Sequence, residues 1–318
     1  MKRMRKIRYR LEYLGVRVAL PLIHVMPAAI SCALARFLAD VAYFLLGKRR
    51  RLAIENIRLG GIADSRRAAA RIARASFRHF GMLVIEGLKA ESVIREDNWR
   101  DFIECDAVSS DVFDLMNDPN AGVILTTAHF GNWEVAAQVL SYMKPLVAIA
   151  RRMNNPYTDN LIQTRKTEHR FQMIPKHEAT GARLLDVLRN GEILAMLIDQ
   201  HARHRGTVLE FLGRPASVHV SSALLHLRSG APICFGYCVR TGPMRYRMES
   251  GPLIVHNPTG SRQQDSAIIM KEISNRLEQA IRAHPEQYLW SHRRWREPAS
   301  TESLEITSHQ SLAVKATD

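Results

Sequence analysis

The stretch "ILTTAHFGNWEVAA", residues 124–137, passes from a short apolar run rich in β-branched residues into a helical pattern. A strand followed directly by a helix is the repeating unit of α/β proteins with parallel sheets. In such sheets, functional side chains collect just beyond the carboxyl ends of the strands. His129 lies two residues after Thr127, the last residue of the apolar run. We therefore expect His129 at the edge of the sheet where chemistry takes place.

The same alternation of apolar runs and helical patterns continues along the chain. Buried strands are predicted at "LVAIA" (146–150) and "ILAMLID" (193–199), with weaker ones at "FQMIP", "PICFGYCV" and "MRYRMES", the last as an added edge strand. Helices are predicted at residues 62–92, from 132 onwards, and at 156–170, 179–191, 218–229 and 265–283. No glycine-rich phosphate loop occurs, which argues against nucleotide binding. The pattern predicts an α/β layered fold with a largely parallel central sheet flanked by helices.

The chain is strongly basic, with 45 Lys and Arg against 31 Asp and Glu and a net charge of +14. Much of this excess lies in "MKRMRKIRYR" (1–10) and "GKRRR" (47–51), and residues 18–35 between them carry no charged side chain. Basic flanks around an uncharged segment are typical of attachment to a bilayer with anionic headgroups. We predict that residues 1–50 form an apolar helical membrane anchor, broken by prolines.

The basic residues at positions 1–10 also indicate on which side of the membrane the chain lies. The positive-inside rule places residues 1–10 in the cytoplasm, and a single span would then put the rest of the chain outside. The cluster at 47–51 is equally basic, so both flanks are expected inside. A half-buried hairpin or an amphipathic anchor satisfies both clusters and is the interpretation that we favour. A single span, and a buried hairpin on a soluble basic protein, are the alternatives.

The rest of the composition bounds the protein class. Four cysteines in 318 residues indicate a reducing compartment and no disulfide scaffold. Residues 299–318 are polar and aperiodic, so we expect a disordered tail. The charge also suits a nucleic-acid-binding protein, but no recognition-module signature occurs, and no nucleic-acid partner is expected. A noncatalytic membrane scaffold is a further alternative.

His129 and Glu134 are the residues with the clearest chemistry. Five residues apart in a regular helix, they would point about 140° away from each other. With Asn132 as the helix N-cap and Gly131 in the preceding turn, the chain can curl His129 back toward the first helical turn. A His–carboxylate pair fixes the tautomer and stabilises the imidazolium that forms as the histidine takes a proton. The alternative is structural: Glu134 favours the helix dipole, and His129 is a turn residue.

The stretch "AHFGNWE" resembles the H-x4-[DE] motif of the lysophospholipid acyltransferase superfamily. Residues 15–298 as a whole resemble its branch of late lipid A acyltransferases, which add lauroyl or myristoyl groups. The supporting stretches, in chain order, are "ENIRLG", "ARRMNNP", "IDQ", "FLGRPA" and "PEQYLWSHRRWR". The resemblance implies the acyltransferase fold and places the catalytic domain at residues 51–298.

The resemblance also implies the reaction. A fatty acyl group would move from an acyl carrier protein or coenzyme A thioester to a hydroxyl of a membrane glycolipid, most directly a lipid A precursor. It would do so at the cytoplasmic face of the inner membrane, without a cofactor. His129 would be the general base, and Glu134 would orient it. Another glycolipid acceptor, such as a phosphoinositide mannoside, remains an alternative.

Further candidates come from the strand that ends at residue 150. Arg151 and Arg152 follow it, so they are expected on the same sheet edge as His129, where a guanidinium can bind a phosphate or a developing oxyanion. Asn155 matches the family's "NP" and is expected to order this loop. The alternative for the arginines is a solvated basic turn.

Asp199 ends the strongest predicted strand and matches the family's aspartate. We expect it at the site, holding an arginine such as Arg152; the alternative is an ordinary strand-end cap. His201 and His204 lie nearby, but their spacing does not fit known zinc motifs, so no metal site is predicted.

The "SHRRWR" stretch, residues 291–296, adds Arg293 and Arg294 as candidates for binding glycolipid phosphates. Trp290 and Trp295 are expected at headgroup depth in the membrane interface. "FLGRPA" is interpreted as a loop that carries Arg214 toward the pocket.

Overall fold

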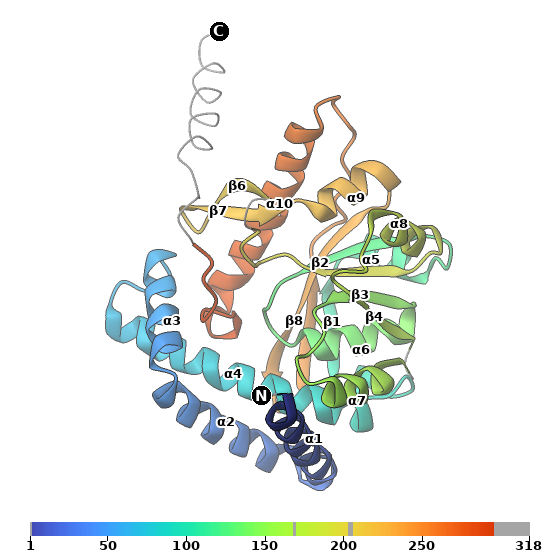
Figure 1. Ribbon diagram of the computed structural model, residues 1–318. Helices are drawn as coiled ribbons and strands as arrows, with labels where there is room; N and C mark the ends of the chain where they lie inside the picture. Colours follow the sequence, from blue (N-terminus) through green and yellow to red (C-terminus); the bar gives the residue numbers. More distant parts are fainter. Residues whose placement is uncertain (1, 168–169, 203–205, 296–318) are drawn as a thin grey trace.

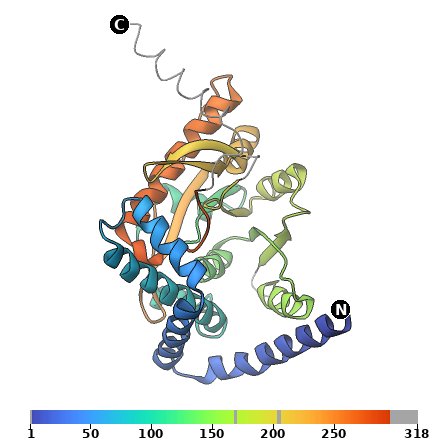
Figure 2. The same cartoon turned by 60° about the vertical axis from the view of Figure 1, so that its left-hand side comes forward.

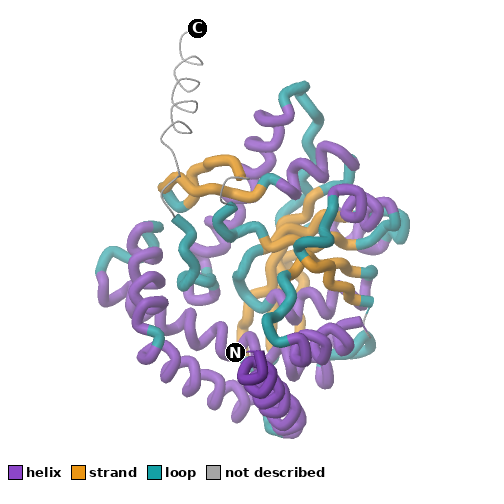
Figure 3. The backbone as a smooth tube through the Cα atoms, viewed as in Figure 1, coloured by secondary structure: helices purple, strands orange, loops and turns teal. Residues whose placement is uncertain are grey.

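The computed structural model describes residues 2–167, 170–202 and 206–295 (Figure 1). The tail at 299–318 and His204 lie outside these residues. The helices are α1 (Lys2–Val25), α2 (Ala28–Leu45), α3 (Gly47–Leu59), α4 (Arg66–Val93), α5 (Ser110–Asn117), α6 (Trp133–Met143), α7 (Pro156–Thr167), α8 (Gly181–Arg189), α9 (Ser221–Ser229) and α10 (Arg262–Ala283), with the short 3-10 helices η1 (Trp99–Asp101) and η3 (Pro285–Gln287). Figure 3 shows most of the strands gathered in one sheet with helices on both sides of it, and a separate hairpin apart from them.

The central sheet has seven strands in the order β1-β9-β8-β2-β5-β3-β4. Their bounds are β1 (Ile103–Val108), β2 (Val123–Thr127), β3 (Leu146–Ala150), β4 (Phe171–Pro175), β5 (Ile193–Leu197), β8 (Ile233–Gly242) and β9 (Arg245–Ser250). Every neighbouring pair is parallel except β8 and β9, which form an antiparallel hairpin. The predicted α/β fold with a largely parallel sheet is confirmed.

One strand prediction and one loop prediction were wrong. β9, expected at an edge, stands inside the sheet, because β1 pairs with its outer side. "FLGRPA" is not a loop. It joins β6 (Gly206–Phe211) to β7 (Arg214–His219) in a separate two-stranded sheet. Leu212 and Gly213 form the turn, both with positive φ (51° and 74°), as a tight two-residue hairpin turn requires.

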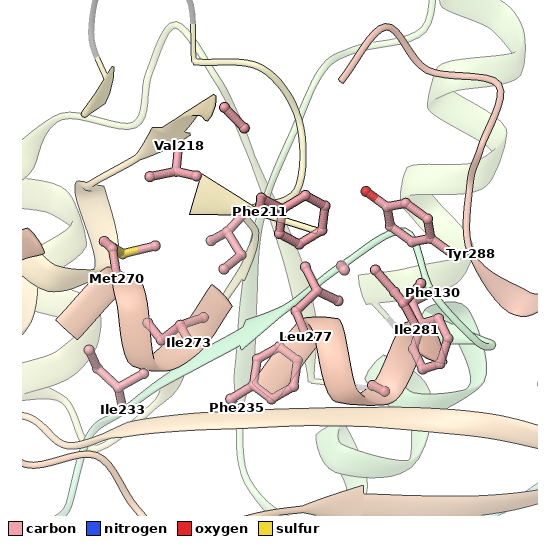
Figure 4. Close-up of a cluster of buried hydrophobic side chains, with 14 of the residues drawn as sticks. Phe130, Phe211, Val218, Ile233, Phe235, Met270, Ile273, Leu277, Ile281 and Tyr288 are labelled. Atoms are coloured by element: carbon pink, nitrogen blue, oxygen red, sulfur yellow. The ribbon is translucent and has the colours of Figure 1, made fainter. Parts of the chain in front are cut away.

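Both faces of the central sheet are covered, which is why its strands are apolar runs and not alternating ones. In β2, Ile124 belongs to the core shared with α8, α9 and α10, whereas Leu125 faces α5 and α6. Figure 4 shows the first of these cores, where side chains of α10 such as Ile273 and Leu277 meet Phe235 of β8.

The first four helices form a separate layer beside the sheet. α2 packs closely along α4: a Cβ added at Gly81 would lie 2.9 Å from the carbonyl oxygen of Ala35. α1 runs from the break at Pro27 across to α7 (Figure 2). Within the described residues, α2 is the one helix long and apolar enough to cross a membrane.

Apolar side chains are exposed along both of the first two helices. On α1 they recur every three or four residues, which defines one helix face; they are Met4, Ile7, Leu11, Leu14, Val18, Leu22 and Val25. On α2 they are Ile30, Leu34, Phe37, Leu38, Val41, Phe44 and Leu45. We call these two sets together the N-terminal apolar face.

Candidate active site

The segment 128–132 is the turn between β2 and α6, and it carries His129. Asn132 is the N-cap of α6, as expected: its Oδ1 accepts a hydrogen bond from Val135 N at 3.2 Å. Gly131 has a φ of +60°, and a Cβ there would lie 2.1 Å from the carbonyl oxygen of Cys238. Only glycine fits this position, so the predicted bend is built into the sequence.

His129 and Asp199 form the central contact of the site. His129 Nδ1 lies 2.8 Å from Asp199 Oδ1, and the side chain of Asp199 is almost completely buried. The two residues follow β2 and β5, which are parallel neighbours, so both leave the sheet at the same edge. We expected Asp199 to hold Arg152, but it pairs with the imidazole. Arg152 is largely exposed, and its Nη1 lies 3.5 Å from Asp159 Oδ2.

The two groups shift each other's protonation. Burial opposes protonation of His129, but the charge of Asp199 and its hydrogen bond outweigh burial, so the pKa of His129 is raised. Burial likewise opposes ionisation of Asp199, and the charge and hydrogen bonds of His129 overcome it, so the pKa of Asp199 is lowered. The site therefore favours an ionised carboxylate beside a histidine that binds a proton readily.

Glu134 lies in the first turn of α6. Its Oε1 accepts a hydrogen bond from Trp133 Nε1 at 3.2 Å, and the Trp133 ring packs edge-on against the His129 imidazole, 5.2 Å between centroids. We expected Glu134 to be the carboxylate at His129 Nδ1, whereas Asp199 occupies that position. Neither Trp133 nor Gln200 was predicted from the sequence to act at the site, although Gln200 Nε2 lies 3.4 Å from His129 Nε2.

A cavity of about 160 Å³ opens beside this turn. It lies between the central sheet and helices α5 and α6, and its lining is almost entirely apolar. Trp133, Glu134 and Thr127 line the end near His129. Met116 and Phe171 line the opposite part, toward the amino ends of the strands. An apolar cavity beside a polar pair suits a substrate with a long hydrocarbon part.

Asn155 orders its loop, as expected. Its Oδ1 accepts from the backbone N–H of Tyr157 at 3.1 Å, at the start of α7. Its Nδ2 donates to the carbonyl oxygen of Tyr9 at 2.9 Å and to Glu12 Oε2 at 3.1 Å. Asn155 thus also fastens α1 to α7. Arg151, which precedes this loop, is exposed.

The arginines proposed from later motifs lie in different environments. Arg214 is exposed at the start of β7, and Arg293 is exposed in the C-terminal segment. Arg294 is buried: its Nη1 donates to the carbonyl oxygen of Ser217 at 2.7 Å, and its guanidinium lies 4.9 Å from the centre of the Phe211 ring. These contacts tie the segment to the β6–β7 hairpin, and the charge of Arg294 helps to lower the pKa of Asp199.

Residues 285–295 form a segment that docks against α3 and α4. Asn56 Nδ2 donates to the carbonyl oxygens of Trp290 (2.8 Å) and His292 (2.7 Å), and Ser76 Oγ donates to that of Tyr288 (2.7 Å). The expectation of Trp290 at headgroup depth was wrong, because its side chain is 1% exposed. Trp295 is half-buried against Phe211.

No group of three His, Cys, Asp or Glu side chains arranged to hold a metal occurs within the described ranges, and His204 falls outside them. The four cysteines are free thiols.

A comparison with models of protein families shows the family of this chain. A family model described as "Bacterial lipid A biosynthesis acyltransferase" matches residues 1–297. The chain belongs to this family. It is 27% identical over 312 residues to the lipid A biosynthesis palmitoleoyltransferase of Escherichia coli (strain K12), covering 94% of this chain and 95% of the relative. The lipid A biosynthesis lauroyltransferase of the same organism is 24% identical over 295 residues, with 91% and 92% covered.

A third relative acts on a different lipid by its name. The phosphatidylinositol mannoside acyltransferase of Mycobacterium tuberculosis (strain CDC 1551 / Oshkosh) is 24% identical over 184 residues, covering 55% of this chain and 54% of the relative. All three relatives are named as enzymes that transfer acyl groups. The protein is therefore an acyltransferase, and the predicted family is confirmed.

Proposed function

We propose that this acyltransferase moves a fatty acyl chain from an acyl carrier protein or coenzyme A thioester to a hydroxyl of a lipid A precursor at the membrane. The observation that carries the proposal is the His129–Asp199 pair, 2.8 Å apart, beside an apolar cavity in a chain of this family. An imidazole backed by a buried carboxylate is suited to remove a proton from an alcohol.

In this mechanism His129 Nδ1–H donates to Asp199, which leaves the lone pair of Nε2 for the acceptor hydroxyl. Nε2 takes the proton as the hydroxyl oxygen attacks the thioester carbonyl carbon. The tetrahedral intermediate then collapses, the C–S bond breaks, and the leaving thiolate takes the proton from the imidazolium. Asp199 stabilises that imidazolium. Gln200 Nε2 lies 3.4 Å from His129 Nε2, so the acceptor hydroxyl would take the place of the Gln200 amide there.

The acyl chain of the donor would occupy the apolar cavity. Its thioester would then lie near Glu134 and Trp133, at the end of the cavity next to His129. Glu134 thus has a role at the cavity entrance, beside the thioester, while Asp199 orients the base. Arg151 and Arg152, exposed on the same sheet edge, are available to bind phosphate groups of the acceptor or the donor.

Membrane attachment would come from the N-terminal apolar face. Its exposed side chains on α1 and α2 are suited to insert into one leaflet, and the basic residues at 1–10 and 47–51 to meet anionic headgroups. We infer that the enzyme lies on the cytoplasmic side of the inner membrane, where thioester donors are made. The acceptor glycolipid would enter the site from that leaflet.

The decisive test is an assay on vesicles that contain a lipid A precursor, with acyl carrier protein and coenzyme A thioesters supplied separately. The change His129→Ala should abolish transfer, because no other group takes the hydroxyl proton. His177→Ala is the matched control, because His177 is largely exposed, on a segment away from the cavity. Product mass by mass spectrometry is the readout. Wild-type turnover by His129→Ala would exclude the general-base role.

The alternative acceptor is a phosphatidylinositol mannoside, as the mycobacterial relative's name suggests. Presenting both lipids in the same vesicles distinguishes the two. The lipid whose mass increases by one acyl group is the acceptor, and the donor that supports the faster reaction is the physiological class.

A further inference from the structure

Two polar side chains of α4 are buried against the turn that carries His129. His79 and Glu86 are seven residues apart, about two helical turns, and therefore share one face of the helix. Their exposed fractions are 1% and 0%. Neither lines the apolar cavity. A buried polar side chain lowers the stability of the fold unless it forms hydrogen bonds. The hydrogen-bond partners of His79 and Glu86 therefore indicate their role.

His79 makes its hydrogen bond to the catalytic turn. Its Nε2 lies 3.0 Å from the carbonyl oxygen of Gly131. Burial lowers the pKa of His79 to about 4, so the ring is neutral at physiological pH and carries one N–H. Because a carbonyl can only accept, that hydrogen is on Nε2. In the described part of the chain Nδ1 is buried without a hydrogen-bond partner.

Glu86 holds the next residue of the turn. Asn132 Nδ2 donates to Glu86 Oε2 at 3.3 Å, which directs Asn132 Oδ1 to the N–H that it caps, Val135 N. The other carboxylate oxygen accepts from Met244 N at 3.4 Å and from Cys32 Sγ at 3.6 Å. All these neighbours are donors, so Glu86 acts as an acceptor that joins α2, α4, the catalytic turn and the turn between β8 and β9.

The backbone of the turn is also held by residues 287–289 and by β8. Gly131 N donates to the carbonyl oxygen of Gln287 at 3.0 Å, and Asn132 N to that of Cys238 at 2.7 Å. Leu289 N donates to the carbonyl oxygen of His129 at 3.0 Å. With these bonds in place, α4 supplies the remaining support. A shift of the turn away from α4 would move His129 relative to Asp199, which follows a different strand, β5.

We propose that His79 and Glu86 are positioning residues for acyl transfer. They touch neither the cavity nor the reacting atoms. They fix Gly131 and Asn132, and through them keep His129 Nδ1 on Asp199 and Nε2 directed at the substrates. This inference rests on the function proposed above for the same turn.

The first test compares His79→Leu with His79→Gln. Leucine fills the space without a donor, whereas the glutamine amide restores an N–H close to the position of Nε2. We expect His79→Leu to lower kcat about 100-fold, the loss typical of a misplaced catalytic group. KM for the acyl donor should stay within about twofold, because the cavity is unchanged, and His79→Gln should recover most of kcat.

The matched control is His226→Leu. His226 is also a buried histidine bonded to a backbone carbonyl, with Nδ1 2.8 Å from the carbonyl oxygen of Ala231, but it lies on α9. We expect a similar loss of thermal midpoint in His226→Leu and His79→Leu, with kcat reduced only in the latter. Equal kcat losses in the two variants would mean that His79 contributes stability alone, and would overturn the proposal.

The second test uses Glu86→Gln, which keeps the shape but turns one acceptor oxygen into an NH2 group facing donors. A readout independent of turnover is the rate at which diethyl pyrocarbonate modifies His129, followed by mass spectrometry on the full chain. We expect faster modification in Glu86→Gln and His79→Leu than in wild type. An unchanged rate together with wild-type kcat would overturn the proposal. If wild type itself transfers no acyl group, the proposed function fails, and the modification rates still decide whether α4 positions His129.

Discussion

The pairing of His129 with Asp199 makes Asp199→Asn the most informative change. Asparagine keeps the shape and removes the charge that favours the imidazolium. Two unit charges about 4 Å apart interact with about 4 kcal/mol at an effective dielectric constant of about 20. If this stabilisation is lost in the transition state, the rate falls by up to about 10³-fold. We expect kcat to drop by this order, with KM for the acyl donor little changed.

The pH dependence gives the same change a second readout. The pKa of His129 is raised in the wild type by the charge of Asp199, against the effect of burial. The rate of a neutral base should therefore rise with pH through a pKa above the ordinary histidine value of about 6.5. Without the charge, burial dominates and lowers this pKa, so the acid limb of the profile should move to lower pH in Asp199→Asn.

The comparison variant is Glu134→Gln, assayed over the same pH range on the same vesicles. We expect it to leave the acid limb where it is in the wild type. If Glu134→Gln moves the limb and Asp199→Asn does not, Glu134 is the carboxylate that acts on the imidazole, and our reasoning from the 2.8 Å contact is refuted.

Three further changes test other parts of the molecule. Gly131→Ala should destabilise the fold by about 3 kcal/mol or more, because it combines a positive φ with a Cβ against a carbonyl oxygen; thermal unfolding measures this, with Gly15→Ala, which meets nothing within 4 Å, as control. Ala148→Phe should partly fill the cavity and shift kcat/KM toward shorter acyl donors, and an unchanged preference across a chain-length series would place the acyl group elsewhere. Leu14→Glu on α1 should weaken cosedimentation with anionic vesicles about tenfold or more, whereas equal binding would show that α1 stays out of the bilayer.

Local patterns predicted the elements around the site well. The apolar runs at β2, β3 and β5 and the turn with Gly131 follow from residue type and spacing alone, because each is fixed by neighbours in the chain. β1 was not predicted. Its sequence "IECDAV" is half-exposed and gains its place from pairing with β9, more than a hundred residues away. Such pairing leaves no local signal.

The same limit explains the carboxylate at His129. Glu134 is close in sequence, and Asp199 is far, so sequence reasoning paired the histidine with Glu134. The choice depends on strand order: β5 lies beside β2 in the sheet, which places Asp199 next to His129. The order of the strands in a parallel sheet cannot be predicted from the sequences of the individual strands. His79 and Glu86 were overlooked for a related reason, since a polar residue on an amphipathic helix resembles any other until its neighbour is known.

The docking of residues 285–295 has a consequence for the order in which the enzyme is made. During synthesis α1 and α2 leave the ribosome before the strands of the sheet, so their exposed apolar side chains can reach a bilayer while the sheet is still incomplete. Three hydrogen bonds can form only after residues 285–295, near the end of the described chain, have been synthesised. They are those that Asn56, Ser76 and Gly131 N donate to carbonyl oxygens of this segment. With the membrane attachment proposed above, the chain reaches the bilayer before its active site is complete, and docking of residues 285–295 then completes that site.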